Sequence, residues 1–183
     1  MQKVILKISL IFTFLIGFQV YSQQNFPESW EGNYKGELQI YGVDSVKMKL
    51  TMKLDIQKKA DSIFQWKMTY DFRGKEDIRD YELKVIDKSK GHYVIDELNT
   101  IVIDGYYKTG IFTSFFEVMD SFIISTYAKK NDNTLVFEII SAEGKNSRIT
   151  GNQSFNGENI PEVKAFNVNG RQKAILKKIL SPN

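Results

Sequence analysis

The stretch Val46–Ile56, with the sequence VKMKLTMKLDI, decides the fold class. Apolar residues occupy every second position of it, and lysine, threonine or aspartate fills the positions between them. A side-chain period of two belongs to a β-strand with one dry and one wet face, whereas a helix would spread these lysines around its circumference. We therefore expect a strand whose apolar side packs against a core.

The same alternation recurs along the chain between short turn-like segments. Strands are expected at 30–40, 46–56, 64–72, 81–85, 93–96, 101–107, 111–118, 122–128 and 135–141, with weaker signals at 147–150, 163–168 and 171–178. Asn169-Gly170 is a tight-turn signal between the last two of these. A helix stays open as an alternative for 111–122, where apolar residues also fit an i, i+4 spacing, and for 174–180.

Hairpin-length links between so many short strands predict an all-β fold, a single antiparallel up-and-down meander. Such a sheet exposes two edges unless it closes, so we expect a closed barrel of about eight to ten strands. The sequence shows no internal repeat and no sign of a second domain. Residues 23–183 are therefore expected to form one domain.

Residues 1–22 have the parts of a secretory signal peptide. Lys3 gives a basic start, residues 4–20 are mostly apolar, and Ser22 is a small residue at the expected cleavage edge. A retained membrane anchor is the alternative, but the uninterrupted apolar run is about a dozen residues, short of the ~20 that span a bilayer. We expect cleavage before Gln23, and a bacterial protein that is periplasmic or secreted without a membrane span.

Composition excludes several classes of site. The chain has no cysteine, which excludes disulfides, thiolate metal sites and a lipidated cysteine. His92 is the single histidine, so one chain cannot form a multi-histidine metal site. The formal charge of +3 includes Lys3 and Lys7 of the signal, which leaves the mature chain at about +1. Nucleic acid binding requires clustered cations, so it is not expected.

Residues 26–36, FPESWEGNYKG, resemble the start of lipocalin-like (calycin) barrels. In that family a short 3₁₀ turn closes the barrel base and leads into a tryptophan beside a glycine, and a basic side chain from the last strand lies over that tryptophan. The resemblance implies that Trp30 plugs the base and that Arg171 or Lys173 covers it. The family order is Gly-x-Trp, whereas this chain has Trp30-Glu31-Gly32. The resemblance bears on the fold and leaves the activity open.

Polar candidates for chemistry are few. His92 could act as a general base or as an axial haem ligand, but we favour a solvent-accessible histidine at a loop edge and expect no cofactor. An acidic cluster surrounds Arg79: Glu76, Asp77, Asp80 and Glu82. It lacks the spacing of a calcium loop, so we expect a solvated strand face, and the same holds for Asp96-Glu97. No nucleophile elbow or phosphate loop is present.

Aromatic and methionine side chains occupy most positions expected to face inward. We expect a non-enzymatic binding protein that holds a small hydrophobic or amphipathic molecule inside the barrel. The expected lining is Tyr34, Met48, Trp66, Tyr70, Tyr81 and Phe116. One alternative is an envelope interaction or structural protein with a filled core and a surface apolar patch. The other is a cofactor-free enzyme, which requires inward carboxylates where the alternation places nearly all of them outside.

Overall fold

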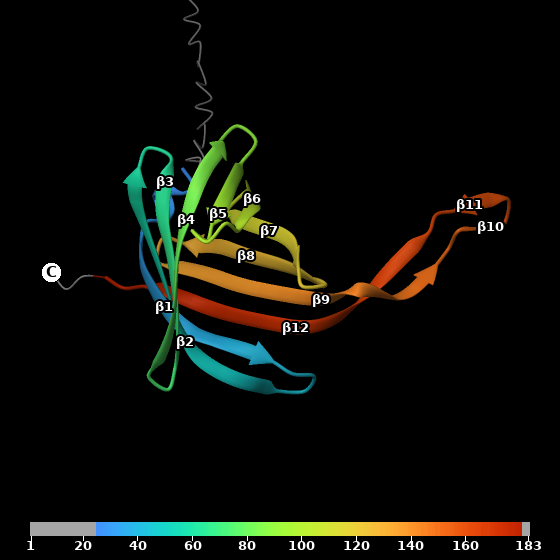
Figure 1. The fold of residues 1–183 in the computed structure, drawn as a ribbon, viewed down its shortest axis with the longest axis horizontal. Helices are drawn as coiled ribbons and strands as arrows, with labels where there is room; N and C mark the ends of the chain where they lie inside the picture. Colours follow the sequence, from blue (N-terminus) through green and yellow to red (C-terminus); the bar gives the residue numbers. More distant parts are fainter. Residues whose placement is uncertain (1–24, 181–183) are drawn as a thin grey trace, which may run out of the picture.

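The computed structural model describes residues 25–180, which form a closed antiparallel β-barrel (Figure 1). A short 3₁₀ helix, η1 (Glu28–Trp30), precedes the strands. The barrel strands are β1 (Gly32–Tyr41), β2 (Val46–Ala60), β3 (Ile63–Phe72), β4 (Lys75–Asp87), β5 (His92–Asp96), β6 (Val102–Lys108), β7 (Ile111–Val118), β8 (Ser121–Asn131), β9 (Thr134–Thr150) and β12 (Val163–Lys178). A small hairpin of β10 (Gln153–Phe155) and β11 (Glu158–Ile160) stands apart from the barrel.

The strands β2 to β9 pair in chain order, and β1 closes the barrel between β12 and β2. Leu38 lies opposite Ala174 on one side and Leu50 on the other. Gly36 permits this closure, because a Cβ at that position would strike the carbonyl oxygen of Ile175. The expected all-β, closed antiparallel meander is therefore confirmed.

Three local expectations are resolved by the strand pairing. Residues 111–122 form β7 and the start of β8, and 174–178 end β12, so neither segment is an α-helix. The tight turn expected at Asn169-Gly170 is wrong. Both residues lie within β12, where irregular pairing with β9 between Val168 and Gly170 absorbs the local distortion.

The outer parts of β9 and β12 leave the barrel together as a two-stranded arm, which we define as residues 143–169. Pairing continues along it from Val168 opposite Ala142 to Val163 opposite Thr150. The β10–β11 hairpin forms its tip, and Figure 1 shows the arm projecting well away from the barrel. The sequence signals at 147–150 and 163–168 thus belong to long strands that outrun their neighbours.

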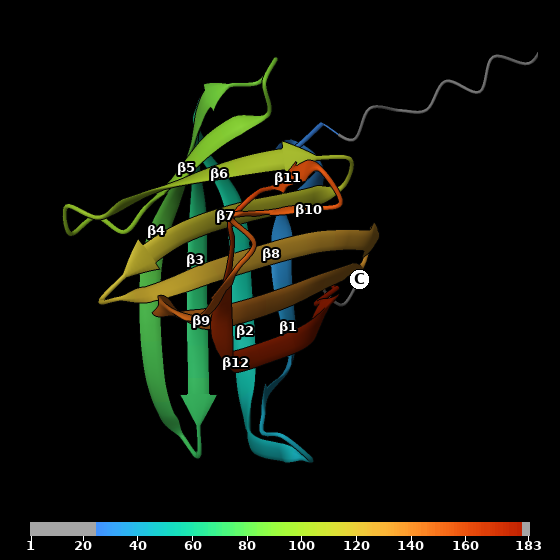
Figure 2. The same cartoon turned by 90° about the vertical axis from the view of Figure 1, so that its right-hand side faces the viewer.

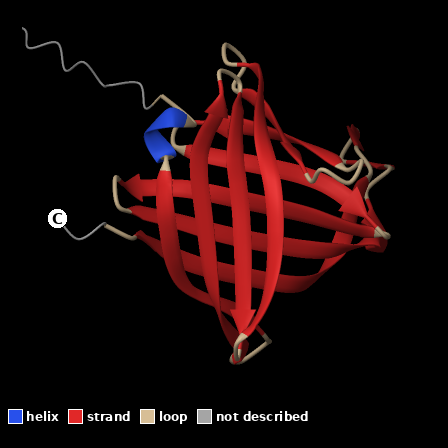
Figure 3. Cartoon of the chain, turned by 60° about the vertical axis from the view of Figure 1, so that its left-hand side comes forward, coloured by secondary structure: helices blue, strands red, loops and turns tan. Residues whose placement is uncertain are grey.

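The barrel has a closed end and an open end. The segment Asn25–Trp30 lies at the closed end, where Figure 3 shows η1 in blue beside the strand termini. The β2–β3, β4–β5, β6–β7 and β8–β9 turns share this end, whereas the other turns and the arm leave from the open end. Between the two ends, alternate side chains from every barrel strand fill the interior.

The expected signal peptide at 1–22 lies outside the described residues. In the part of the chain that the structure describes, no helix combines the length and apolar character that crossing a bilayer requires.

Candidate functional site

The closed end is sealed by an aromatic plug, which we define as residues 25–30. Trp30 is fully buried, and Phe26 packs edge-on against it with ring centroids 4.8 Å apart. Phe26 also stacks on Tyr107 at 4.6 Å and meets Tyr93 edge-on at 4.8 Å. Edge-to-face and stacked contacts of this kind add stability beyond the buried area itself. No ligand can enter from this end without displacing the plug.

Hydrogen bonds tie the plug backbone to the surrounding strands. Tyr34 Oη donates to the carbonyl oxygen of Trp30 at 2.9 Å, and Tyr93 Oη donates to that of Phe26 at 3.1 Å. Lys129 Nζ, on a side chain that is 3% exposed, donates to the carbonyl oxygen of Ser29 at 2.7 Å. Such bonds satisfy backbone acceptors that would otherwise be buried without partners.

The cations at this end differ from the expected ones. Lys178 Nζ donates to the carbonyl oxygen of Glu31 at 2.6 Å and lies 5.8 Å from the ring centroid of Tyr34. Arg171 lies at the far end of β1, where it stacks over Tyr41 at 5.0 Å and pairs with Glu138 at 2.8 Å. The expectation that Arg171 covers Trp30 is wrong, because β12 runs antiparallel to β1 and only its last residues reach the plug.

The interior holds a cavity of about 100 Å³ between the plug and the open end. Its walls come from seven neighbouring strands, β3 to β9. The lining residues are Trp66, Met68, Tyr70, Arg79, Tyr81, Ile95, Glu97, Ile103, Ser114, Phe116, Ser125, Tyr127, Phe137 and Ile139. Four expected ligand-binding residues, Trp66, Tyr70, Tyr81 and Phe116, are among them.

The two remaining expected residues lie elsewhere. Tyr34 is 1% exposed and packs beside the plug, away from the cavity wall. Met48 is 42% exposed and lines a shallower groove of about 800 Å³ between the β1–β2 hairpin and the β3–β4 turn. Exposed charged side chains, including Lys47 and Arg73, border this groove. The smaller interior cavity is the better ligand site, since apolar walls can remove a ligand from water.

The cavity floor is aromatic and carries an unused hydrogen-bond donor. Trp66 is fully buried and meets Tyr127 edge-on at 5.1 Å. Its Nε1 has no hydrogen-bond partner among the described residues, which leaves a buried donor unsatisfied. Burial raises the pKa of Tyr127, whose hydroxyl donates to Met68 Sδ at 3.0 Å.

Three polar side chains border the cavity toward the open end, from β4 and from the residue that follows β5. We call them the mouth: Arg79, Tyr81 and Glu97. The guanidinium carbon of Arg79 lies 5.3 Å from the ring centroid of Tyr70, and its Nη2 is 3.3 Å from a carboxylate oxygen of Asp77. Burial raises the pKa of Tyr70 to about 12, against the opposing charge of Arg79. Burial and then the charge of Glu97 raise the pKa of Tyr81. Both hydroxyls stay protonated at neutral pH and can donate.

Sequence reasoning missed the mouth, although a signal for it was present. Arg79 was expected on a solvated face, yet it lies opposite Met68 just as Tyr81 lies opposite Trp66. Directly opposed residues point to the same side of a sheet, so Arg79 shares the inward parity of Tyr81. Glu97 likewise follows Ile95 at a spacing of two and lines the cavity. Glu97, expected with Asp96 on a solvated strand face, is therefore an exception to the outward placement expected for nearly all carboxylates.

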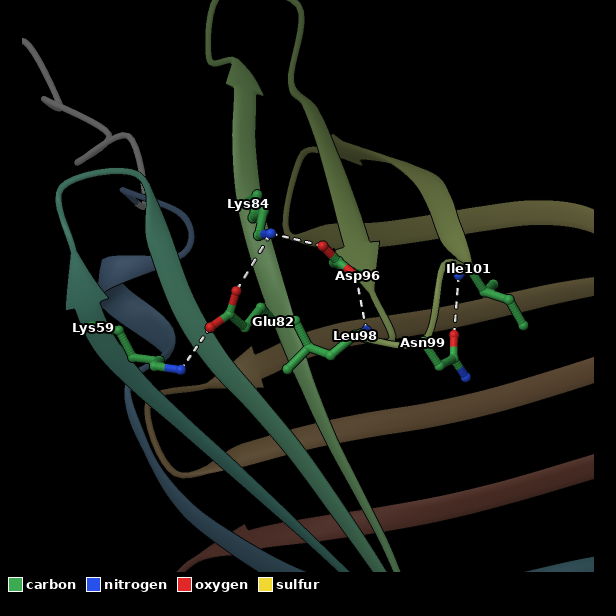
Figure 4. Close-up of polar contacts among 7 residues, drawn as sticks. All are labelled: Lys59, Glu82, Lys84, Asp96, Leu98, Asn99 and Ile101. Carbon is green, nitrogen blue, oxygen red and sulfur yellow. Dashed lines mark hydrogen bonds and ion pairs between the residues drawn. The ribbon is translucent and has the colours of Figure 1, made fainter.

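The loop beside Glu97 is ordered by short side-chain bonds (Figure 4). Asp96 Oδ1 accepts from the backbone N–H of Leu98 at 2.8 Å, and Asn99 Oδ1 accepts from that of Ile101 at 3.0 Å. Asp96 also accepts from Lys84 Nζ at 2.7 Å. These contacts fix the β5–β6 connection and with it the rim of the mouth.

His92 lies on the outer face of β5, because its neighbour Tyr93 points into the barrel. Its Nε2 is 2.6 Å from Asp104 Oδ1, and its ring stacks on Tyr106 with centroids 4.9 Å apart. It cannot contact a molecule in the cavity from there. Among residues 25–180, no three His, Asp or Glu side chains gather closely enough to hold a metal ion.

Several solved structures resemble this barrel, among them the following two. An S-type phycobiliprotein lyase, CPES from Guillardia theta, superposes with a TM-score of 0.57 at 6% identity, over 85% of this chain and 91% of that one. A protein of unknown function from the DUF3598 family of Nostoc punctiforme gives a TM-score of 0.52 at 8% identity, over 83% of this chain and 48% of that one. At such low identity the likeness establishes the fold alone.

No protein-family model matches the sequence, and no curated protein does. The closed ten-stranded barrel fits a calycin-like fold, and membership of the lipocalin-like family stays a prediction.

Proposed function

We propose that this protein binds a small amphipathic molecule, with the apolar part in the interior cavity and the polar part at the mouth. The observation that carries the proposal is one cavity with an aromatic floor, an unsatisfied Trp66 donor and a rim of Arg79, Tyr81 and Glu97. Ligand sites commonly combine apolar walls with a few convergent polar groups. The phycobiliprotein lyase shares the barrel architecture, which is consistent with a binding role.

The cavity volume limits what can be bound. A cavity of about 150 Å³ holds a benzene molecule, and drug-sized ligands occupy about 300 Å³ or more. The cavity of about 100 Å³ is smaller than that, so in this conformation it takes a short chain or the edge of one ring, with the rest of the molecule outside the mouth. Larger ligands require Arg79 and Tyr70 to move apart, and Arg79 is exposed enough to do so.

The two tryptophans make the proposal testable by fluorescence. A Trp30→Phe variant retains Trp66, in the cavity wall, as its one indole. Titration with 8-anilinonaphthalene-1-sulfonate, which joins apolar rings to an anionic group, is expected to quench Trp66 and raise the melting temperature. An unchanged Trp66 spectrum together with an unchanged melting temperature would overturn the proposal.

A cavity-filling variant provides the matched control. Ser114 is buried and lines the cavity, so Ser114→Leu occupies the space that the probe needs. We expect this variant to fold and to bind the probe weakly. Equal binding by both proteins would show that the probe lies elsewhere on the surface.

We also propose that the protein acts after export, in the periplasm or outside the cell. The proposal rests on the basic start, apolar middle and small residue of segment 1–22. The intact mass of protein recovered from the producing cell tests it. A chain beginning at Gln23 is the expected result, and a chain that retains residues 1–22 would contradict it.

A further inference from the structure

The outer surface of the barrel carries an apolar patch, which we define as Phe115, Phe122, Ile124, Ile140, Phe166 and Val168. In Figure 2 the strands that bear it, β7, β8, β9 and β12, lie side by side and cross over β1–β4. Phe115 lies opposite Ile124, which in turn lies opposite Ile140. These three side chains are 65%, 39% and 38% exposed.

Aromatic contacts join Phe115, on β7, to the part of the arm nearest the barrel. The ring of Phe122 lies 6.0 Å from that of Phe115 and 5.1 Å from that of Phe166, centroid to centroid. Val168, which is 63% exposed, pairs with Ala142 beside them. The patch is thus continuous across four strands, unlike the singly scattered apolar residues of an ordinary surface.

The opposite outer face shows what solvated strands of this chain look like. Ion pairs cover it, including Lys49–Glu37 at 2.9 Å and Lys53–Glu76 at 2.9 Å. Lys59, Glu82, Lys84 and Asp96 form a connected row there (Figure 4). On β7–β9 and β12 the outward apolar side chains instead lie beside one another, with the Arg171–Glu138 pair at their border.

The arm also lacks a partner within the described chain. Pairing of β9 with β8 ends at Glu143, and pairing of β12 with β1 begins at Gln172, so both edges of the arm are unpaired between these limits. Ile149, Phe155 and Val163 on it are 53%, 64% and 53% exposed. A two-stranded ribbon is marginally stable alone in water, and unpaired edges favour association with another chain.

The exposed apolar area matches what a stable interface needs. Phe115, Phe155 and Phe166 together present roughly 340 Å² at their observed exposures, taking about 200 Å² for a whole side chain. The exposed Ile and Val of patch and arm bring this to roughly 500 Å². A standard interface buries about 800 Å² per partner, of which about 60% is apolar. Patch and arm together supply that apolar share.

The charges around this surface favour a second copy over other partners. The arm carries three acidic residues, Glu143, Glu158 and Glu162, and three basic ones, Lys145, Arg148 and Lys164. Anionic membranes and nucleic acids attract surfaces with an excess of cations, which this balance does not provide. A balanced surface can meet a copy of itself without net repulsion.

We propose that two copies of this chain associate, with the arm of each lying on the apolar patch of the other. In a two-fold arrangement both copies use the same surfaces. The arm of each copy then covers the patch of the other, so no arm and no patch is left exposed. The inference is independent of the ligand cavity, because the patch lies on the outer face of the barrel wall and the cavity lies on its inner face.

Analytical ultracentrifugation of the purified protein is the first test, and it should give twice the monomer mass across the micromolar range. Phe115→Glu on the patch and Phe155→Glu at the arm tip should each give monomers with an unchanged far-ultraviolet circular dichroism spectrum. Phe155 lies away from the barrel, so its variant keeps the test decisive if Phe115→Glu misfolds. Val43→Glu, at a turn residue that is 97% exposed, should stay dimeric.

The absence of cysteine permits a direct test of the arrangement. A mixture of Phe155→Cys and Ile124→Cys chains should form a disulfide between the two variants, whereas Phe155→Cys with Val43→Cys should not. A monomer at every concentration overturns the proposal, as does a dimer that Phe155→Glu leaves intact. A monomer that floats with phosphatidylglycerol vesicles assigns the patch to a membrane instead.

Discussion

The closed and open ends of this barrel are built from the same strands but are filled differently. At the closed end, Phe26 and Trp30 are buried among rings from β5 to β7, and backbone oxygens of the plug accept hydrogen bonds from several strands. At the open end, Arg79 and Glu97 occupy inward positions and leave a small cavity below them. The alternation along a strand thus determines which side chains point into the barrel. The type of residue at each inward position, apolar or polar, determines whether that part of the interior is packed core or ligand site.

We expect the closed end to determine the stability of the fold and the open end to determine ligand binding. The largest expected effect is on stability, at the closed end. Trp30→Ala should lower the free energy of unfolding by about 3–5 kcal/mol, because it removes a fully buried aromatic side chain and leaves a void. Urea unfolding followed by Trp66 fluorescence measures it. Val43→Ala should change stability by less than about 0.5 kcal/mol. A loss below about 1 kcal/mol for Trp30→Ala would mean that the plug is not part of the core.

Gly105→Ala probes how tightly the aromatic layer is packed against the strands. A methyl group on Gly105 would collide with the ring of Phe112, so we expect a loss of about 1–3 kcal/mol. The same substitution in a Phe112→Leu background should have a smaller effect, since the smaller side chain can give way. Equal effects in both backgrounds would assign the loss to the backbone of β6 rather than to the ring. Thermal and urea unfolding of the four proteins give the comparison.

Arg79→Gln tests the open end. We expect this substitution to weaken ligand binding and to leave the free energy of unfolding nearly unchanged. Its ion pair with Asp77 is exposed, and such pairs contribute less than about 1 kcal/mol. The affinity for 8-anilinonaphthalene-1-sulfonate should fall about tenfold, which corresponds to about 1.4 kcal/mol. Lys67→Gln, on the outer face of β3 opposite Asp80, should bind normally. A variant that binds like the wild type would remove Arg79 from the site.

The smallest expected effect is a pH dependence of stability that arises from Asp87, in the β4–β5 turn at the closed end. Hydrogen bonding to Ser89, with further bonds to the Lys90 backbone, lowers the pKa of Asp87 from 3.8 to about 2. A carboxylate with a depressed pKa in the folded state stabilises the fold above its unfolded pKa, and this contribution is lost as the pH falls toward 2. The difference in melting temperature between wild type and Asp87→Asn should therefore shrink between pH 5 and 2. A constant difference would show that Asp87 does not act through its charge.

The sequence predicted the barrel better than the site, for a physical reason. A period of two is a local property, so Val46–Ile56 and its neighbours revealed strands and their inward faces directly. The closure of the barrel and the shape of the cavity depend on how strands of different length align with one another. The sequence of a single strand does not determine this alignment. Four of six expected ligand-binding residues line the cavity, while Tyr34 and Met48 lie nearer the two ends of the barrel.

Charged residues caused the main errors. Arg79 and Glu97 obey the same alternation as Tyr81 and Ile95, but their charge favoured an outward assignment over their parity. The cationic partners of the plug, Lys129 and Lys178, come from strand ends whose position follows from the barrel geometry rather than from local pattern. The sequence did not predict the arm either. Its strands show the same alternation of apolar and polar residues as the barrel strands, so the pattern does not reveal which strands leave the barrel.

Closure of the barrel by its first and last strands has a consequence for folding. Tyr34 pairs with Lys178, so the contacts that complete the sheet join residues separated by nearly the whole described chain. Such long-range pairing slows folding, because the entropy of closing a long loop is lost before the contact forms. Because β12 follows every other barrel strand along the chain, the ribosome delivers it after them, and the barrel can close only once β12 has been synthesised.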